Sequence, residues 1–96
     1  MARTFEVVGG PSVLDLMISH WYREQDWGRR EVQFQAREER ADLSLRMVVN
    51  EASRENEDGT TWRLKGRLRI LGQYGDRVEG IYNSQTRQGI FFVLHP

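Results

Sequence analysis

Residues 62–71 read Trp62-Arg63-Leu64-Lys65-Gly66-Arg67-Leu68-Arg69-Ile70-Leu71, a strict alternation of apolar and basic residues with one glycine in an apolar position. Because successive side chains of a β-strand point to opposite faces, this alternation predicts a strand with one buried face and one solvated face. The basic residues Arg63, Lys65, Arg67 and Arg69 all fall on the solvated face. The rest of the chain can be aligned beside this strand.

Four further segments show the same period of two, and polar or glycine-containing breaks separate them. They predict strands at 31–37, 42–51, 77–83 and 88–95, beside the central strand at 60–71. The breaks are short enough for hairpin connections, which favours an antiparallel meander. A shorter β-prone run at 4–8 ends at Gly9-Gly10-Pro11 and can add a sixth strand.

The segment 11–25 has a period of 3.6 residues instead. Ser12 is placed as an N-cap, and Asp15 follows three residues later as in a capping box. One side of the resulting helix is apolar and is expected to pack on the sheet; its members are Val13, Leu14, Met17, Ile18 and Trp21. The predicted fold class is α+β: one amphipathic helix on a curved five- or six-stranded antiparallel meander, in a single domain over residues 1–96.

The alternation also predicts which residues share a face, because a slip of one residue would turn a whole strand inside out. Phe34 is expected beside Leu45 on the buried face, and Gly80 beside Phe92 in the final hairpin. This alignment leaves an apolar cluster on the outer face, made of Val48, Ile81, Phe91 and Val93.

Composition limits the classes of protein that fit. A chain of 96 residues with 39% hydrophobic and 29% charged residues is typical of one soluble globular domain. The absence of cysteine excludes disulfides and thiolate metal sites. The sequence has neither a run of about 20 apolar residues nor the apolar core of a signal peptide, so we expect a cytoplasmic protein without membrane contact.

The outer face is expected to carry a local excess of positive charge, although the formal net charge is zero. Zero net charge argues against a dedicated nucleic-acid binder. Arginine suits bidentate recognition of carboxylate or phosphate, and all but one of the 14 cationic residues are arginines. Two interpretations stay open: a face that binds phosphate, nucleotide or nucleic acid, or a solvated face whose charges resist aggregation. The cations concerned are Arg46, Arg63, Lys65, Arg67 and Arg69.

Two pairs on this face follow from the predicted alignment. Arg67 is expected opposite Arg46, an unfavourable like-charge pair, and Arg69 opposite Glu79, a favourable ion pair.

The last predicted strand is apolar on both faces over residues 89–94, so it should be covered on both sides. Cover could come from the Phe5–Val8 segment or from a second copy of the chain. A symmetric oligomer is the more economical arrangement, with Val48, Ile81, Phe91 and Val93 as its interface.

The sequence contains no motif that specifies catalysis. His20 and His95 are the only histidines, and they do not form a metal-ligand spacing. The serines lack a nucleophile elbow, and the glycines form neither a P-loop nor a dinucleotide-binding turn. No cofactor or metal is therefore implied. The predicted function is a small non-catalytic binding or interaction module that acts as a homo-oligomer or with a protein partner; the alternative is an anion, nucleotide or nucleic-acid binder.

Overall fold

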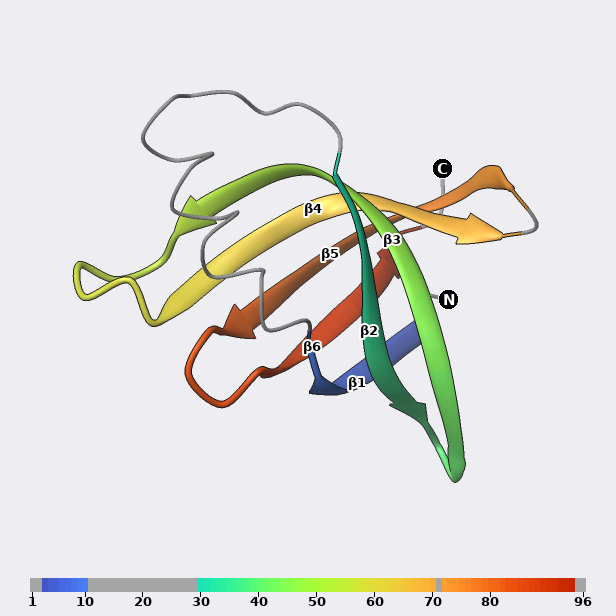
Figure 1. Ribbon diagram of the computed structural model, residues 1–96, viewed down its shortest axis with the longest axis horizontal. Helices are drawn as coiled ribbons and strands as arrows, with labels where there is room; N and C mark the ends of the chain where they lie inside the picture. The colour runs from blue at the N-terminus through green and yellow to red at the C-terminus, as the bar shows by residue number, and fades with distance from the viewer. Residues whose placement is uncertain (1–2, 11–29, 71, 95–96) are drawn as a thin grey trace.

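Six antiparallel strands close into a barrel (Figure 1). The computed structural model describes residues 3–10, 30–70 and 72–94. The strands are β1 (Arg3–Gly9), β2 (Arg30–Glu38), β3 (Ala41–Arg54), β4 (Thr61–Ile70), β5 (Gln73–Asn83) and β6 (Gln88–Leu94). Each strand pairs with the next along the chain, and β1 also pairs with β6. Both edges of the meander are therefore paired, which removes the exposed backbone groups of an open sheet.

The predicted α+β class is wrong, because the described residues form an all-β barrel and contain no helix. The expectation of a small domain of antiparallel strands is confirmed. The predicted helix at 11–25 lies outside the described residues. Closure depends on β1, where Glu6 stands opposite both Arg37 of β2 and Ile90 of β6. Since β1 lies beside β6, the Phe5–Val8 segment does not cover the outer face of β6.

The alternation predicted for β4 is confirmed. Trp62, Leu64 and Leu68 are buried inside the barrel, whereas Lys65 and Arg67 are exposed on its outer surface. β4 therefore has one apolar face in the core and one charged face toward solvent.

Every strand contributes side chains to one core. Its centre is aromatic: the ring of Phe34 lies 5.6 Å from that of Tyr82 and 5.1 Å from that of Phe91. Both contacts are edge-to-face, the arrangement that the charge distribution of aromatic rings favours. These rings fill the middle of the barrel. The members of the core are Phe5, Val7, Val32, Phe34, Ala36, Leu45, Met47, Val49, Ala52, Trp62, Leu64, Leu68, Val78, Tyr82, Phe91 and Val93.

Gly80 makes room for one of these central rings. It stands opposite Phe91 in the β5–β6 pair, and the Phe91 ring lies over its backbone. A Cβ atom at Gly80 would overlap Phe91 Cδ1 and approach the Ile90 carbonyl oxygen to 2.6 Å. A side chain at this position would therefore displace Phe91 from the core.

The turn between β5 and β6 determines how these strands are aligned. Asn83 Oδ1 accepts hydrogen bonds from the backbone N–H groups of Gln85 (2.9 Å) and Thr86 (3.0 Å). The Arg87 N–H donates to the Asn83 carbonyl at 2.8 Å, and Arg87 adopts a positive φ of 59°. Asn83 consequently stands opposite Gln88, and this pair fixes the register of the hairpin.

The predicted register of this hairpin is wrong by one residue. Gly80 faces Phe91 and not Phe92, so Phe91 and Val93 point into the barrel with no exposed surface. The reason is that β6 is apolar on both faces, so the sequence does not show which of its alternate residues point inward. In the β2–β3 pair, where one face is polar, the predicted pairing of Phe34 with Leu45 is confirmed.

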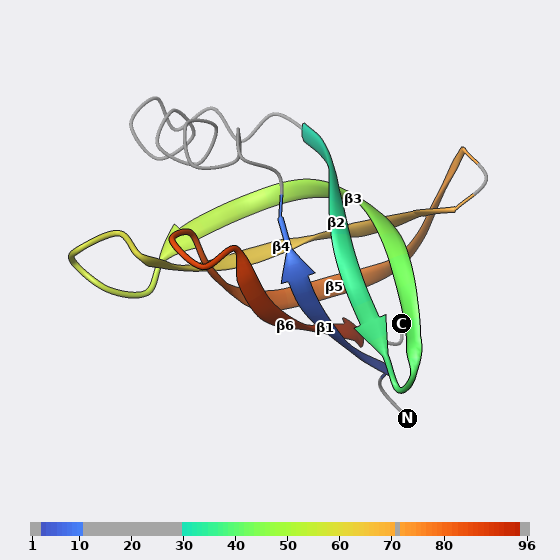
Figure 2. The same ribbon diagram turned by 60° about the horizontal axis from the view of Figure 1, so that its bottom comes forward.

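Irregularities in the pairing bend the strands around the core (Figure 2). The register shifts between Val49 and Glu51 in β3 and between Arg67 and Arg69 in β4. Such bulges increase the local twist and help a sheet to close.

Candidate functional site

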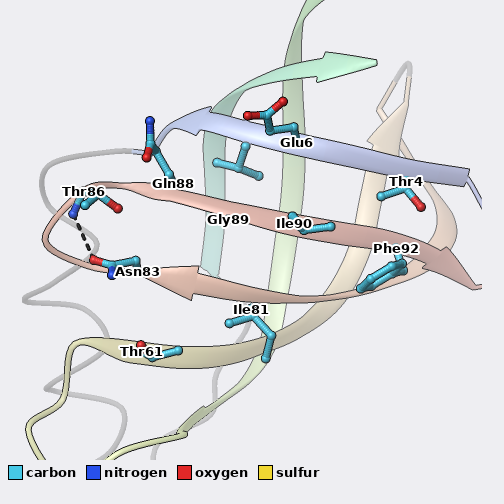
Figure 3. A pocket seen from close by; sticks show the side chains of 11 residues that line it. Thr4, Glu6, Thr61, Ile81, Asn83, Thr86, Gln88, Gly89, Ile90 and Phe92 are labelled. Atoms are coloured by element: carbon cyan, nitrogen blue, oxygen red, sulfur yellow. Dashed lines mark hydrogen bonds between the residues drawn. The ribbon is translucent and has the colours of Figure 1, made fainter. Parts of the chain in front are cut away.

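A shallow groove of about 630 Å³ lies on the outer surface over β1, β5 and β6 (Figure 3). Its apolar lining includes the side chains of Ile81, Ile90 and Phe92, which we call the apolar triad. Ile90 is 50% exposed and Phe92 is 44% exposed, the largest exposures of big apolar side chains in the described residues. Exposed apolar surface gathered in one depression is a feature of binding sites.

The register of the sheet brings the apolar triad together. Ile81 of β5 stands directly opposite Ile90 of β6. Phe92 lies two residues further along β6, between Thr4 of β1 and Glu79 of β5. Because Phe91 and Val93 point inward, Ile90 and Phe92 must point outward, and Figure 3 shows both on the outer side of their strand.

The edges of the groove are polar but almost uncharged. Among the described residues, Glu6 is the only charged one in its lining. An apolar centre with a polar rim and few charges is the usual composition of a protein–protein interface. The neutral polar residues of the lining are Thr4, Thr61, Asn83, Thr86 and Gln88.

The four residues predicted as an oligomer interface do not form one surface. Phe91 and Val93 belong to the core, so their predicted outer placement is wrong. Val48 is also buried, at 4% exposure, although it is not part of the core cluster. Ile81 is half-buried and lines the groove. Because the predicted register is wrong by one residue, the outer positions of β6 belong to Ile90 and Phe92 and not to Phe91 and Val93.

The predicted cationic face divides into residues with and without acidic neighbours. Arg63 donates to Glu79 Oε1 and to Glu55 Oε1, both at 2.7 Å, and these bonds raise the pKa of Arg63 above its ordinary value. Lys65 stands between Glu51 of β3 and Glu79 of β5. These two cations are therefore balanced locally by carboxylates.

The predicted pair of Arg69 with Glu79 does not occur in the register, because Arg69 stands opposite Tyr74 and Glu79 opposite Lys65. The predicted pair of Arg67 with Arg46 is also wrong. Arg67 faces Val48 on β3 and Arg77 on β5.

Arg77 was missed by the sequence prediction, although the sequence holds a signal for it. The alternation places Val78 on the buried face, so the preceding residue has to point outward; its position opposite Arg67 follows only from the observed register.

Within residues 3–10, 30–70 and 72–94, no three His, Cys, Asp or Glu side chains are grouped so that they could hold a metal ion. His20 and His95 lie outside these ranges. None of the described residues belongs to a helix long and apolar enough to cross a membrane.

The geometry thus defines a small closed β-barrel with a filled centre and two distinct outer surfaces. No protein-family model matches the chain. Comparison with curated proteins and with solved structures likewise gives no match.

Proposed function

We propose that this protein is a small interaction module that associates with a second copy of itself through the outer groove. The observation that carries the proposal is the apolar triad, in which Ile90 and Phe92 expose about half of their surface in one depression. The filled aromatic centre supports an outer site over an interior one, because Phe34, Tyr82 and Phe91 occupy the middle of the barrel.

Closure of the barrel restricts how two copies can meet. β1 and β6, the first and last strands, are already paired with each other. Addition of a partner strand to an open edge is therefore not available, and contact must be made face to face. Face-to-face association needs an apolar patch with complementary surroundings, which the groove offers.

The polar residues of the groove favour an identical copy as the partner. Threonine hydroxyls and the amide of Gln88 each donate and accept hydrogen bonds, so they can pair with the same groups of a second copy. Since Glu6 is the only charged residue that the described part of the chain contributes to the groove, there is little like-charge repulsion when the groove faces itself. A symmetric dimer requires such a self-complementary patch.

Substitution Phe92→Lys tests the proposal. Phe92 stands opposite Glu79, so a lysine there gains an acidic neighbour and leaves the inner face of β6 untouched. Loss of a central aromatic residue and the introduction of facing charges should weaken association by about 2 kcal/mol or more, roughly 30-fold in Kd. Sedimentation equilibrium over a wide concentration range measures this change.

Gln35→Lys is the matched control, because Gln35 is exposed on the outer face of β2 opposite Ser44 and does not line the groove. It adds the same charge and should leave the dimer intact. A wild-type protein that stays monomeric at the highest concentrations, or a Phe92→Lys variant that dimerises as tightly as Gln35→Lys, contradicts the proposal.

A further inference from the structure

One pair of facing residues departs from the charge pattern of the sheet. In the described strands, four cross-strand pairs of charged residues join opposite charges: Glu6–Arg37, Arg37–Asp42, Glu51–Lys65 and Lys65–Glu79. A fifth pair, Arg67–Arg77, joins two cations. Like charges directly opposite each other in a sheet are destabilising. The fold thus tolerates here an arrangement that it avoids elsewhere in the described sheet.

The surroundings of this pair do not neutralise it fully. Arg67 and Arg77 are both exposed, and neither forms an ion pair with a carboxylate within the described part of the chain. By contrast, Arg3 and Arg63 are bonded to carboxylates. Asp76 is the nearest acidic neighbour in sequence. The pKa of Arg3 is raised mainly by its hydrogen bond to Glu38, and the charge of Asp76 adds a smaller contribution there.

Arg67 and Arg77 line a common depression of about 100 Å³, together with Gly75, Asp76 and Leu94. This volume is well below the roughly 300–1,000 Å³ of sites that enclose a whole small molecule. It can accommodate a single oxyanion, with the remainder of a ligand lying on the open outer face.

A third arginine lies on the same outer face. Val48 of β3 stands opposite Arg67, and Arg46, two residues from Val48, points to the same side of the sheet. Diagonal neighbours of this kind are about 7–8 Å apart at Cα, within reach of long side chains. Arg46 is exposed and, among the described residues, forms no ion pair with a carboxylate.

We propose that Arg67 and Arg77, with Arg46 beside them, form a binding site for a phosphate group. The planar guanidinium group donates two parallel hydrogen bonds to a phosphate, and two guanidinium groups can approach one phosphate from neighbouring strands. Binding would also remove the repulsion between the two arginines. This site is separate from the groove and does not depend on the proposed self-association.

The test compares Arg67→Gln and Arg77→Gln with Arg37→Gln, which removes one positive charge from an exposed arginine that is paired with Asp42. The Arg Nε–H resonances are followed by NMR during titration with inorganic phosphate and, at equal ionic strength, with chloride. A hydrogen bond between charged groups contributes about 1.5–3 kcal/mol, so each site variant should lose about tenfold or more in phosphate affinity. Arg37→Gln should change it by less than about twofold, as expected for an exposed charge outside the site.

A second probe identifies the source of the phosphate. Binding of a labelled single-stranded oligonucleotide is measured at several salt concentrations with the same variants. Loss of this binding in Arg67→Gln and Arg77→Gln, with a steep salt dependence in the wild type, supports a phosphodiester ligand. Selective binding of inorganic phosphate alone supports a free anion.

Loss of the site must be separated from loss of the fold. Arg77→Gln removes a like-charge contact, so without phosphate it should melt at the wild-type temperature or above. Phosphate should raise the melting temperature of the wild type and of Arg37→Gln, but not that of Arg77→Gln. The proposal is overturned if phosphate acts no differently from chloride and oligonucleotide binding is no weaker in the site variants than in Arg37→Gln.

Discussion

Strands β4 and β6 are alike inside the barrel and opposite outside it. Inward, β4 contributes Trp62, Leu64 and Leu68, and β6 contributes Phe91 and Val93, so both present only apolar side chains to the core. Outward, β4 carries cations, whereas β6 carries Ile90 and Phe92. The inner faces therefore stabilise the barrel, and the outer faces give it two separate surfaces.

A consequence is that neighbouring residues of the same type should differ widely in their contribution to stability. A buried side chain contributes the free energy of its transfer from water and of its packing, whereas an exposed one contributes little of either. Variants of inward-facing and outward-facing residues test this difference.

The largest effect is expected within β6. Phe91→Ala removes a fully buried ring that packs against Phe34, and it should lower the free energy of unfolding by about 3–5 kcal/mol. Phe92→Ala, one residue away, should cost less than about 1 kcal/mol because its ring is partly exposed. Urea unfolding of both variants measures the difference. Equal losses would contradict the assignment of Phe91 alone to the core, and the reverse order would show that Phe92 is the residue that points into the barrel.

Gly80→Ala should have an intermediate effect. The added Cβ would overlap the Phe91 ring, so we expect a loss of about 1–3 kcal/mol, as for other overpacked cores. Gly9→Ala is the matched control, because a Cβ at Gly9 would lie 3.7 Å from its nearest neighbour, an ordinary contact. If the two variants unfold at the same denaturant concentration, close packing of Phe91 on Gly80 is not what excludes a side chain there.

The smallest effect is expected from surface charge. Arg3 donates two hydrogen bonds to Glu38, at 3.1 Å to Oε1 and 3.0 Å to Oε2, and these hold the pKa of Glu38 below its ordinary value. Since the folded pKa is lower than the unfolded one, the contribution of Glu38 to stability is complete above the unfolded pKa. It is lost as the pH falls through the folded value.

Arg3→Gln should therefore reduce the fall in melting temperature between about pH 5 and pH 3, and the effect should shrink with added salt. Thermal melts across this pH range provide the measurement, with Arg40→Gln in the adjacent turn as the control. A fall of the same size in Arg3→Gln and in the wild type would assign the acid sensitivity to other carboxylates.

Prediction from the sequence succeeded where a strand has one polar face. In β2, β3 and β4 a polar outer face left only one phase, so the core positions of Phe34, Leu45 and Leu64 could be read from the alternation. It failed in β6, where both faces are apolar. The register of this hairpin follows from its turn, since pairing of Asn83 with Gln88 across residues 84–87 already implies that Gly80 faces Phe91.

Local alternation along the chain is enough to predict the period of the strands, the inner faces of β2 to β4 and the basic outer face of β4. The pairing of β1 with β6 and of Arg67 with Arg77 appears only in the folded barrel. The folded barrel also brings Ile90 and Phe92 together in the groove. Closure and cross-strand neighbours depend on pairing between distant segments and on bulges that shift the register, and a period of two is compatible with several such pairings.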